Sequence, residues 1–489
     1  MIQATERKTK KQKTVINEDI QNYFMFPLSN LVVKTPWKLN EQQAEALIAL
    51  EEFRANQNER QFTLCGYAGT GKTSIINLFH QLLRQRYRSP IYSAPTHRAL
   101  SVINQMNPSA RTITLAKIFG LRPEFKIEEG AYTIQDLEFS QQGKPTIEYG
   151  DFLIIDECSM VSEALYEFIQ QNIWQYGLKV LYVGDAAQIK PVKEDQISRV
   201  FENRHGRTVT LTKVERTGDN PILKEATDLR NGMDFSRITS LNAEGHGVEY
   251  LSKADARMII KREFPELSTY PLHIRCLAGT NAVVKSSNKI IREILNLTKQ
   301  IEVGEVLMGY DNFGYEYATE SYDIINSGDY HVQSVKEGIK IVGDTTYSGF
   351  DVCLVNAMNH EMNTVFIVDN NEDPDKVSLF VNDVKNLNIQ AEYYRRSGDR
   401  QQAAIHYTKA NELKGSLAFM KDHYSKDGRL IQYKTLDYGY SHTIHKSQGG
   451  TYDKILIVED SINAFNDESL KQQLKYVALS RARKNVFIV

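Results

Sequence analysis

The stretch that decides the fold reads Phe62-Thr63-Leu64-Cys65-Gly66-Tyr67-Ala68-Gly69-Thr70-Gly71-Lys72-Thr73. A strand-like run is followed by the pattern Gly-x4-Gly-Lys-Thr, and a helix-like segment spans residues 74–84. Glycines allow the backbone to curl, so that successive N–H groups face a phosphate at the helix N-terminus. We expect Lys72 to reach the β- and γ-phosphates and the Thr73 hydroxyl to ligate Mg²⁺. The alternatives are a coincidental match or a loop that binds another anion.

A second segment supplies the carboxylates that nucleotide hydrolysis needs. It reads Phe152-Leu153-Ile154-Ile155-Asp156-Glu157 and places two acids at the carboxyl end of an apolar strand, where α/β sheets bind their ligands. We expect Asp156 to hold Mg²⁺ and Glu157 to polarise the attacking water. Taken alone, two adjacent acids at a strand end are commonly a solvated cap. Together with the phosphate loop, they predict a hydrolytic site.

Arginines are the best donors to a transferring phosphoryl group, because the guanidinium is planar and permanently charged. Arg216 and Arg481 are the candidates, although by themselves they are indistinguishable from ordinary surface arginines.

Around these segments, short strand-like runs alternate with helix-like ones, which predicts a parallel sheet wrapped by helices. The runs are Phe62–Cys65, Ile91–Ala94, Phe152–Ile155 and Val180–Val183. Residues 120–150 break this rhythm and suggest a β-hairpin insertion. Residues 302–435 break it again with short strands around a helical stretch at about 384–423. That stretch resembles one tetratricopeptide unit, and a single unit cannot bury its own face, so it predicts an inserted helical hairpin. The chain ends on a strand at residues 485–489.

The bulk properties are those of a soluble multidomain protein. The 489 residues are too many for one compact core, and 41% hydrophobic with 25% charged residues is ordinary globular composition. The net charge of -2 gives no bulk argument for nucleic acid. We find no membrane-length apolar run and no signal-peptide core. The scattered cysteines 65, 158, 276 and 353 predict free thiols in a reducing cytosol. The lysine-rich start predicts a solvated tail, with nucleic-acid contact as the less favoured alternative.

Taken in order, these segments resemble the motifs of superfamily 1 helicases, from about Leu39 to the C-terminus. The forms Pro95-Thr96-His97, Asp156-Glu157-Cys158-Ser159-Met160 and Gln188-Ile189-Lys190-Pro191-Val192 are similar to the RecD-like branch, superfamily 1B, and its Dda-like group. The resemblance implies an α/β fold of two RecA-like P-loop domains, with a β-hairpin pin insertion and an SH3-like accessory domain carrying a helical projection.

The resemblance also implies domain boundaries. They are a tail at 1–36, a first RecA-like domain (1A) at 37–195 with the pin (1B) at about 120–150, a second RecA-like domain (2A) at 196–301 and 436–489, and the accessory domain (2B) at 302–435.

Nucleotide-site roles follow from the same resemblance. Gln43, in Leu39-Asn40-Glu41-Gln42-Gln43, would read adenine, and Gln188 would sense the γ-phosphate. Arg216 matches the arginine of the fourth motif and Arg481 that of the sixth. The catalytic set is Lys72, Asp156, Glu157, Gln188, Arg216 and Arg481, and the metal ligands are Thr73 and Asp156. The residues expected to bind ATP are Gln43, Gly66, Ala68, Gly69, Thr70, Gly71, Lys72, Thr73, Gln448 and Gly449.

DNA-contacting roles are implied in the same way. The residues are Pro95, Thr96, His97, Thr112, Thr280, Asn281, Thr443, His445 and Lys446. Phe125 or Tyr132 would be the wedge of the strand-separating pin, and the alternative is that either ring packs on its own hairpin. One position departs from the family, since Thr114 stands where members often have histidine. A hydroxyl still bonds a phosphate oxygen, but the imidazole is lost.

The function implied is that of a cytoplasmic, ATP- and Mg²⁺-dependent DNA helicase of a bacterial or phage-infected cell. It would move 5′-to-3′ on single-stranded DNA and act at single/double-strand junctions, with no membrane partner; single-strand-binding and replisome proteins are the protein partners considered. The polarity comes from the resemblance alone. Three alternatives stay open: a nucleic-acid translocase or remodeller that separates no strands, an RNA helicase, and a non-enzymatic P-loop scaffold.

Overall fold

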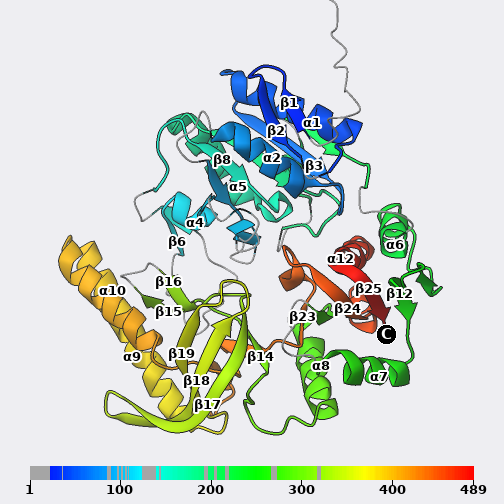
Figure 1. Ribbon diagram of the computed structural model, residues 1–489. Coiled ribbons are helices and arrows are strands. Elements are labelled where there is room, and N and C mark those ends of the chain that lie inside the picture. The colour runs from blue at the N-terminus through cyan, green and yellow to red at the C-terminus, as the bar shows by residue number, and fades with distance from the viewer. Residues whose placement is uncertain are drawn as a thin grey trace, which may run out of the picture.

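The structure is a computed structural model of the chain, organised in three lobes (Figure 1). It describes residues 23–35, 37–84, 90–95, 99–100, 103–104, 107, 110–123, 139–141, 145–191, 196–202, 206–214, 220–265, 273–316 and 321–489. None of the described helices is both long enough and apolar enough to cross a membrane.

The first lobe is built on a six-stranded parallel sheet in the order β10-β3-β9-β8-β4-β5. Its strands are β3 (Gln61–Gly66), β4 (Ile91–Ser93), β5 (Arg111–Thr112), β8 (Phe152–Ile155), β9 (Lys179–Gly184) and β10 (Arg207–Leu211). Alternate residues of β8 face opposite sides: Phe152 and Ile154 pack with helices α1 (Glu41–Ala55) and α2 (Lys72–Leu83), and Leu153 and Ile155 with α4 (Leu115–Ile118) and α5 (Glu163–Gln175). Helices therefore cover both faces, as a parallel sheet requires.

β10 corrects one predicted boundary. It pairs in parallel with β3, and its last residue, Leu211, belongs to the core of the first lobe. The boundary predicted after residue 195 therefore falls before the last strand of the first sheet.

The predicted tail contains a described hairpin, β1 (Tyr23–Phe26) with β2 (Leu31–Lys34). Phe26 and Val33 are buried in the core of the first lobe. The buried Glu51 of α1 accepts hydrogen bonds from the Leu28 N–H at 2.9 Å and the Ser29 N–H at 2.8 Å, which holds the turn against the helix. Both strands are short apolar runs around Pro27-Leu28-Ser29-Asn30, and treating residues 1–36 as one polar tail overlooked them.

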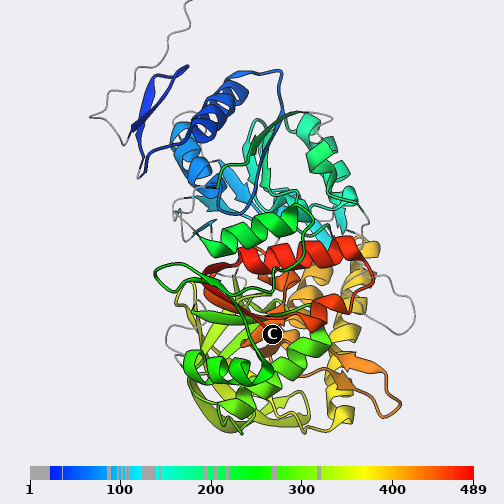
Figure 2. The same ribbon diagram turned by 90° about the vertical axis from the view of Figure 1, so that its right-hand side faces the viewer.

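The second lobe has a sheet in the order β11-β12-β25-β24-β13-β23, parallel except for the β11–β12 pair. Its strands are β11 (Ser240–Leu241), β12 (Gly247–Tyr250), β13 (Ile274–Ala278), β23 (Ser441–Thr443), β24 (Tyr452–Val458) and β25 (Ala482–Ile488). Helices α6 (Pro221–Arg230) and α12 (Glu468–Ser480) pack on one face, and α7 (Lys253–Glu263) and α8 (Asn281–Ile294) on the other. Figures 1 and 2 show α6 and α12 on the side of this lobe that faces the first lobe.

The third lobe holds an antiparallel sheet in the order β19-β18-β17-β14-β22 and a two-stranded sheet β15-β16. The strands are β14 (Val306–Gly309), β15 (Phe313–Glu316), β16 (Ser321–Ile324), β17 (Asp329–Val342), β18 (Thr345–Asn356), β19 (Met362–Val368) and β22 (Leu436–Tyr438). Because β22 pairs with β14 here, the boundary predicted after residue 435 falls before this lobe's last strand.

The helical hairpin projects from this lobe as α9 (Pro374–Arg396) and α10 (Arg400–Lys414). It begins before the predicted residue 384, because Asp373 caps the helix and Pro374 follows at its first position. It also ends before the predicted residue 423. Leu417 and Phe419 leave the helical path and are buried in the core beneath the hairpin, while Ala418 bridges to Ile367 of β19.

Buried polar contacts join the second and third lobes. Arg275 of β13 is fully buried, with Nη2 2.8 Å from Asp329 Oδ1 at the start of β17, and it also donates to the Gly439 carbonyl. Arg292 of α8 donates to Glu305 at 2.8 Å, and Tyr440 donates to the same carboxylate at 3.0 Å. These pairs stand where two sheets meet, so the junction excludes water.

In the predicted pin region, β6 (Leu121–Pro123) and β7 (Phe139–Gln141) pair antiparallel. Phe125 and Tyr132 fall on residues 124–138, outside the described residues, so the pin role stays a prediction.

Candidate functional site

The phosphate loop connects β3 to α2. Gly69 and Gly71 take φ values of 80° and 87°, in the left-handed region that favours glycine. At residue 71 a Cβ atom would lie 2.6 Å from Gln43 Nε2, so a side chain there would displace the Gln43 amide. Lys72 Nζ donates to the carbonyls of Gly66 at 2.5 Å and Tyr67 at 3.1 Å, which places the ammonium inside the curve of the loop. The loop thus has the cationic cradle that phosphates need.

Gln43 of α1 is hydrogen-bonded to the backbone of this loop. Its Oε1 accepts from the Asn40 N–H at 3.2 Å as part of a helix cap, and its Nε2 donates to the Thr70 carbonyl at 3.1 Å. The buried amide therefore positions the loop here, while adenine reading stays a prediction. The neighbouring Gln42 accepts from the N–H groups of Thr212 and Lys213, and Arg216 comes just after, outside the described residues.

Asp156 and Glu157 follow β8, one strand away from the loop across β9. The Asp156 carboxylate accepts from the Glu157 N–H at 2.9 Å, and Glu157 has a φ of 51°, which costs about 1 kcal/mol or more for a residue with a side chain. Burial raises the pKa of Asp156, and the negative charge of Glu157 raises it further. A cation beside this carboxylate would favour its ionised form.

A magnesium ion fits these residues. Among the described residues no cluster of three His, Cys, Asp or Glu side chains could hold a metal. The candidate ligands are instead the Asp156 carboxylate and the exposed Thr73 at the start of α2, with Lys72 close enough to lower the pKa of Asp156. Mg²⁺ commonly binds through one or two protein oxygens plus nucleotide phosphates, which is the donor set available here.

Residues 185–188 follow β9 and contact the second lobe; we call them the coupling segment. Asp185 Oδ1 accepts from the Ala187 N–H at 3.0 Å, and Gln188 Oε1 lies 3.5 Å from Gln448 Nε2 of the second lobe. Gly449 touches Ala99 of the first lobe: a Cβ at residue 449 would come within 3.2 Å of the Ala99 Cβ, and its φ is 74°. Gln188 and Gln448-Gly449 are thus brought together.

Two aromatic contacts reach the phosphate loop from the second lobe. The Tyr476 hydroxyl of α12 donates to Asp185 Oδ2 at 2.7 Å and accepts from the Ala68 N–H at 3.1 Å. Arg230 of α6 places its guanidinium carbon 3.5 Å from the centre of the Tyr67 ring. Sequence reasoning missed Tyr476 and Arg230. The only signal for Tyr476 was its place in the predicted sixth motif, five residues before Arg481.

Arg481 caps the C-terminus of α12 and is buried. Its Nε donates to the Val477 carbonyl at 3.2 Å, and its Nη2 to Ser480 Oγ at 2.8 Å. Its Nη1 lies 3.4 Å from the Gly450 carbonyl. The guanidinium therefore makes its hydrogen bonds within the second lobe. Its role as a donor to the phosphates stays a prediction.

The candidate DNA residues gather at strand ends on the same side of both sheets. Pro95 follows β4 and Thr112 ends β5, while Thr280 follows β13 and Thr443 ends β23. These are neighbouring strands at one edge of each sheet, whereas the phosphate loop follows β3, the second strand from the opposite edge of the first sheet. Thr112 Oγ1 donates to Asn104 Oδ1 at 2.8 Å. Thr96 and His97 lie outside the described residues.

Thr280 and Thr443 also have local structural roles. Thr280 caps α8 by accepting from the Val283 N–H at 3.3 Å, and Asn281 is exposed at the first position of that helix. Thr443 accepts from the Lys446 N–H at 3.3 Å, and burial lowers the pKa of His445.

Lys446 lies between the second and third lobes. Its Nζ is 3.4 Å from the centre of the Tyr310 ring, and Lys434 Nζ is 4.0 Å from the same ring. Burial and the charge of Lys434, against the opposing effect of Asp437, lower the pKa of Lys446 to about 7. Tyr310, Lys434 and Asp437 were not singled out from the sequence: the first two lie in the irregular region predicted at 302–435, and Asp437 lies just after it.

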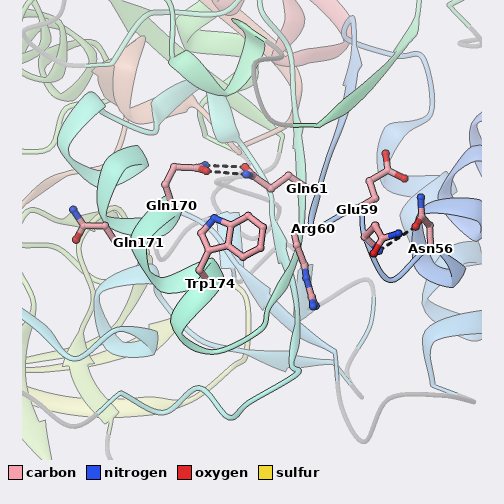
Figure 3. Close-up of a pocket in the computed structure, with 8 residues that line it drawn as sticks. Asn56, Glu59, Arg60, Gln61, Gln170, Gln171 and Trp174 are labelled. Atoms are coloured by element: carbon pink, nitrogen blue, oxygen red, sulfur yellow. Dashed lines mark hydrogen bonds between the residues drawn. The ribbon is translucent and has the colours of Figure 1, made fainter.

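A groove of about 680 Å³ lies away from this site, between the α1–β3 connection and α5 (Figure 3). Gln61 and Gln170 exchange hydrogen bonds of 2.7 Å across it, and Trp174 is exposed beside them. Gln61 begins β3, so the groove is at the amino end of the strand, opposite to the phosphate loop. It contains none of the predicted site residues.

Comparison with known proteins shows what the chain is similar to. Residues 38–249 match the family described as AAA domain, and residues 438–489 match the UvrD-like helicase C-terminal domain. The ATP-dependent DNA helicase dda of Enterobacteria phage T4 is 25% identical over 456 residues, covering 88% of this chain and 95% of the relative. An uncharacterized protein of Acanthamoeba polyphaga mimivirus is 22% identical, covering 91% and 99%.

The Pif1 helicase from Bacteroides, solved with ADP-AlF3 and single-stranded DNA, is 18% identical, with a TM-score of 0.49 and 91% of each chain covered. The first family match covers the strands of the first parallel sheet, and the second covers β23, β24 and β25; β13 and the Thr280-Asn281 motif lie between the two matches. Over nearly its whole length the chain is thus similar to an ATP-dependent DNA helicase, and these similarities support a helicase of the superfamily 1B type.

Proposed function

We propose that this chain translocates 5′-to-3′ on single-stranded DNA and unwinds duplex DNA, driven by ATP hydrolysis. One observation carries the proposal: the phosphate loop, Asp185 and Gln188 of one parallel sheet contact Tyr476 and Gln448 of another. A nucleotide at this interface touches elements of both lobes. Binding and hydrolysis of the nucleotide therefore change the relative free energies of the possible arrangements of the two lobes. A motor requires such a change.

In this proposal Lys72 binds the phosphates and Glu157 polarises the attacking water. Thr73 and Asp156 hold Mg²⁺, which when bound neutralises phosphate charge. Arg216 and Arg481 donate to the transferring phosphoryl group, Arg481 from the second lobe. The single strand runs along the edges marked by Pro95, Thr96, His97 and Thr112 in the first lobe and by Thr280, Asn281, Thr443, His445 and Lys446 in the second.

The strand separation rests on similarity to the phage T4 relative, whose name describes a DNA helicase. The direction rests on the resemblance of the motifs to superfamily 1B. The competing function is translocation or remodelling on a single strand, DNA or RNA, without unwinding. Strand separation would be the work of Phe125 or Tyr132.

The test uses three matched duplexes with a 5′ overhang, a 3′ overhang or blunt ends, each offered with ATP and Mg²⁺. We expect unwinding of the 5′-overhang duplex only, and none by Lys72→Ala. A parallel assay follows displacement of streptavidin from the 3′ end of a biotinylated single strand. Displacement without unwinding would establish the competing function, and unwinding of only the 3′-overhang duplex would reverse the proposed direction. RNA versions of both substrates decide the nucleic-acid type.

A further inference from the structure

We infer that Tyr476 is a positioning residue that couples the phosphate loop to the second lobe, and that it does so through its hydroxyl group. The inference rests on the proposed motor function and adds a residue to it. The hydroxyl is shared by two groups of the first lobe: it donates to Asp185 Oδ2 at 2.7 Å and accepts from the Ala68 N–H at 3.1 Å. One atom of α12 thus touches both the phosphate loop and the coupling segment.

Burial makes this contact strong. Asp185 is completely buried and Tyr476 is 2% exposed, so water does not replace the hydrogen bonds when they break. A bond from a hydroxyl to a carboxylate in such surroundings is among the stronger hydrogen bonds in proteins. Burial also raises the pKa of Tyr476 far above neutrality, and the charge of Asp185 raises it further, so the hydroxyl stays a donor.

Arg230 makes a second, independent contact between the second lobe and the phosphate loop. Its guanidinium lies over the Tyr67 ring at 3.5 Å, and it is close enough to lower the pKa of Tyr476. Two adjacent residues of the phosphate loop are therefore held by different helices. Helix α6 contacts the Tyr67 side chain, and α12 contacts the Ala68 backbone. A movement of the loop cannot leave both helices in place.

The consequence runs along α12. Tyr476 lies inside this helix and Arg481 caps it, so the two are separated by about 7 Å of rigid helix at 1.5 Å per residue. A displacement of Ala68 or Asp185 is carried through the hydroxyl to the segment that holds Arg481. The phosphate loop and the predicted arginine donor then move as connected parts.

Tyr476→Phe tests this, because it removes the hydroxyl and keeps the ring that packs in the second lobe. Tyr250→Phe is the matched control. Tyr250 also donates to a buried carboxylate, Glu225 at 2.7 Å, but within the second lobe and away from the phosphate loop. ATP hydrolysis is measured in the full chain with and without saturating single-stranded DNA.

For Tyr476→Phe we expect the DNA-stimulated kcat to fall about tenfold, with a change in the KM for ATP of less than about threefold. This corresponds to loss of one charge-assisted hydrogen bond. Tyr250→Phe should match the wild type. Stimulation within twofold of the wild type in Tyr476→Phe overturns the inference, as does a loss that falls mainly on KM or equally on both variants. If the wild-type chain itself shows no DNA stimulation, the proposed motor function fails instead.

Discussion

Lys446 offers a direct test of where the single strand lies, because its charge is set by its surroundings. Its ammonium stacks on Tyr310 at 3.4 Å, and burial together with Lys434 lowers its pKa to about 7, from an ordinary value of 10.5. A lysine that binds a backbone phosphate must be protonated. Above pH 7 the free protein is mostly neutral at this position, so binding must then take up a proton.

The magnitude follows from the pKa. Each pH unit above the pKa costs about 1.4 kcal/mol for protonating the amine, which is about tenfold in affinity. Between pH 6.0 and pH 8.5 we therefore expect the dissociation constant for single-stranded DNA to rise about 30-fold through Lys446 alone. The sign is that acid strengthens binding and alkali weakens it, with the change concentrated above pH 7.

Fluorescence anisotropy of a labelled oligodeoxythymidine, at one fixed ionic strength, measures this dependence. Lys446→Arg is the matched variant, because arginine keeps both its charge and its stacking on Tyr310 at every pH used. The ratio of wild-type to Lys446→Arg affinities cancels the titration of histidines and of the surrounding protein. A ratio that stays constant from pH 6.0 to 8.5 refutes the reasoning, because Lys446 would then either hold its proton throughout or not touch the DNA.

Lys72→Ala should abolish DNA-stimulated ATP hydrolysis, since it removes the ammonium group that lies inside the phosphate loop; stimulation that survives means that this is not the nucleotide site. Arg481→Ala should lower kcat by about 10³–10⁵ while leaving binding of a fluorescent ATP analogue largely intact, and a loss of binding would instead assign the arginine to folding of the second lobe. Arg275→Met should lower stability by about 3–5 kcal/mol, because it leaves the Asp329 carboxylate buried without its partner. Pairing Arg275→Met with Asp329→Leu should recover part of that loss in urea denaturation, and no recovery argues against the ion pair as the cause. Replacing residues 388–409 with a short glycine linker should preserve folding and ATP hydrolysis, because the buried core at Leu417 and Phe419 is left in place; reduced unwinding would show that the helical projection takes part, and full unwinding would show that it does not.

The sequence predicted best the parts that short-range patterns determine. Phe152–Ile155 has the same bounds in the prediction and in the structure, because four apolar residues buried on both faces leave little choice. The phosphate loop was found with its flanking strand and helix for a similar reason: glycines, lysine and threonine at fixed spacing have one well-known physical use.

Contacts between distant residues could not be predicted in this way. Tyr476 meets Asp185 and Ala68 across 291 and 408 residues, and no periodicity in the sequence relates such positions. The boundaries after residues 195 and 435 were misplaced because β10 and β22 each pair with a strand that comes earlier in the sequence, β3 and β14. Sheet membership is a property of pairing, which the composition of a single strand does not show.

The junction of the second and third lobes affects how this chain is assembled. Only Gly439 and Tyr440 separate β22 of one sheet from β23 of the next, and a Cβ at residue 439 would come within 3.3 Å of Arg275 Nη1. Removing the third lobe would therefore expose the buried guanidinium of Arg275 and remove its ion-pair partner, Asp329. The two lobes should unfold in a single cooperative step, and exchange of the third lobe between relatives should succeed only if the arginine, the aspartate and the glycine are transferred together.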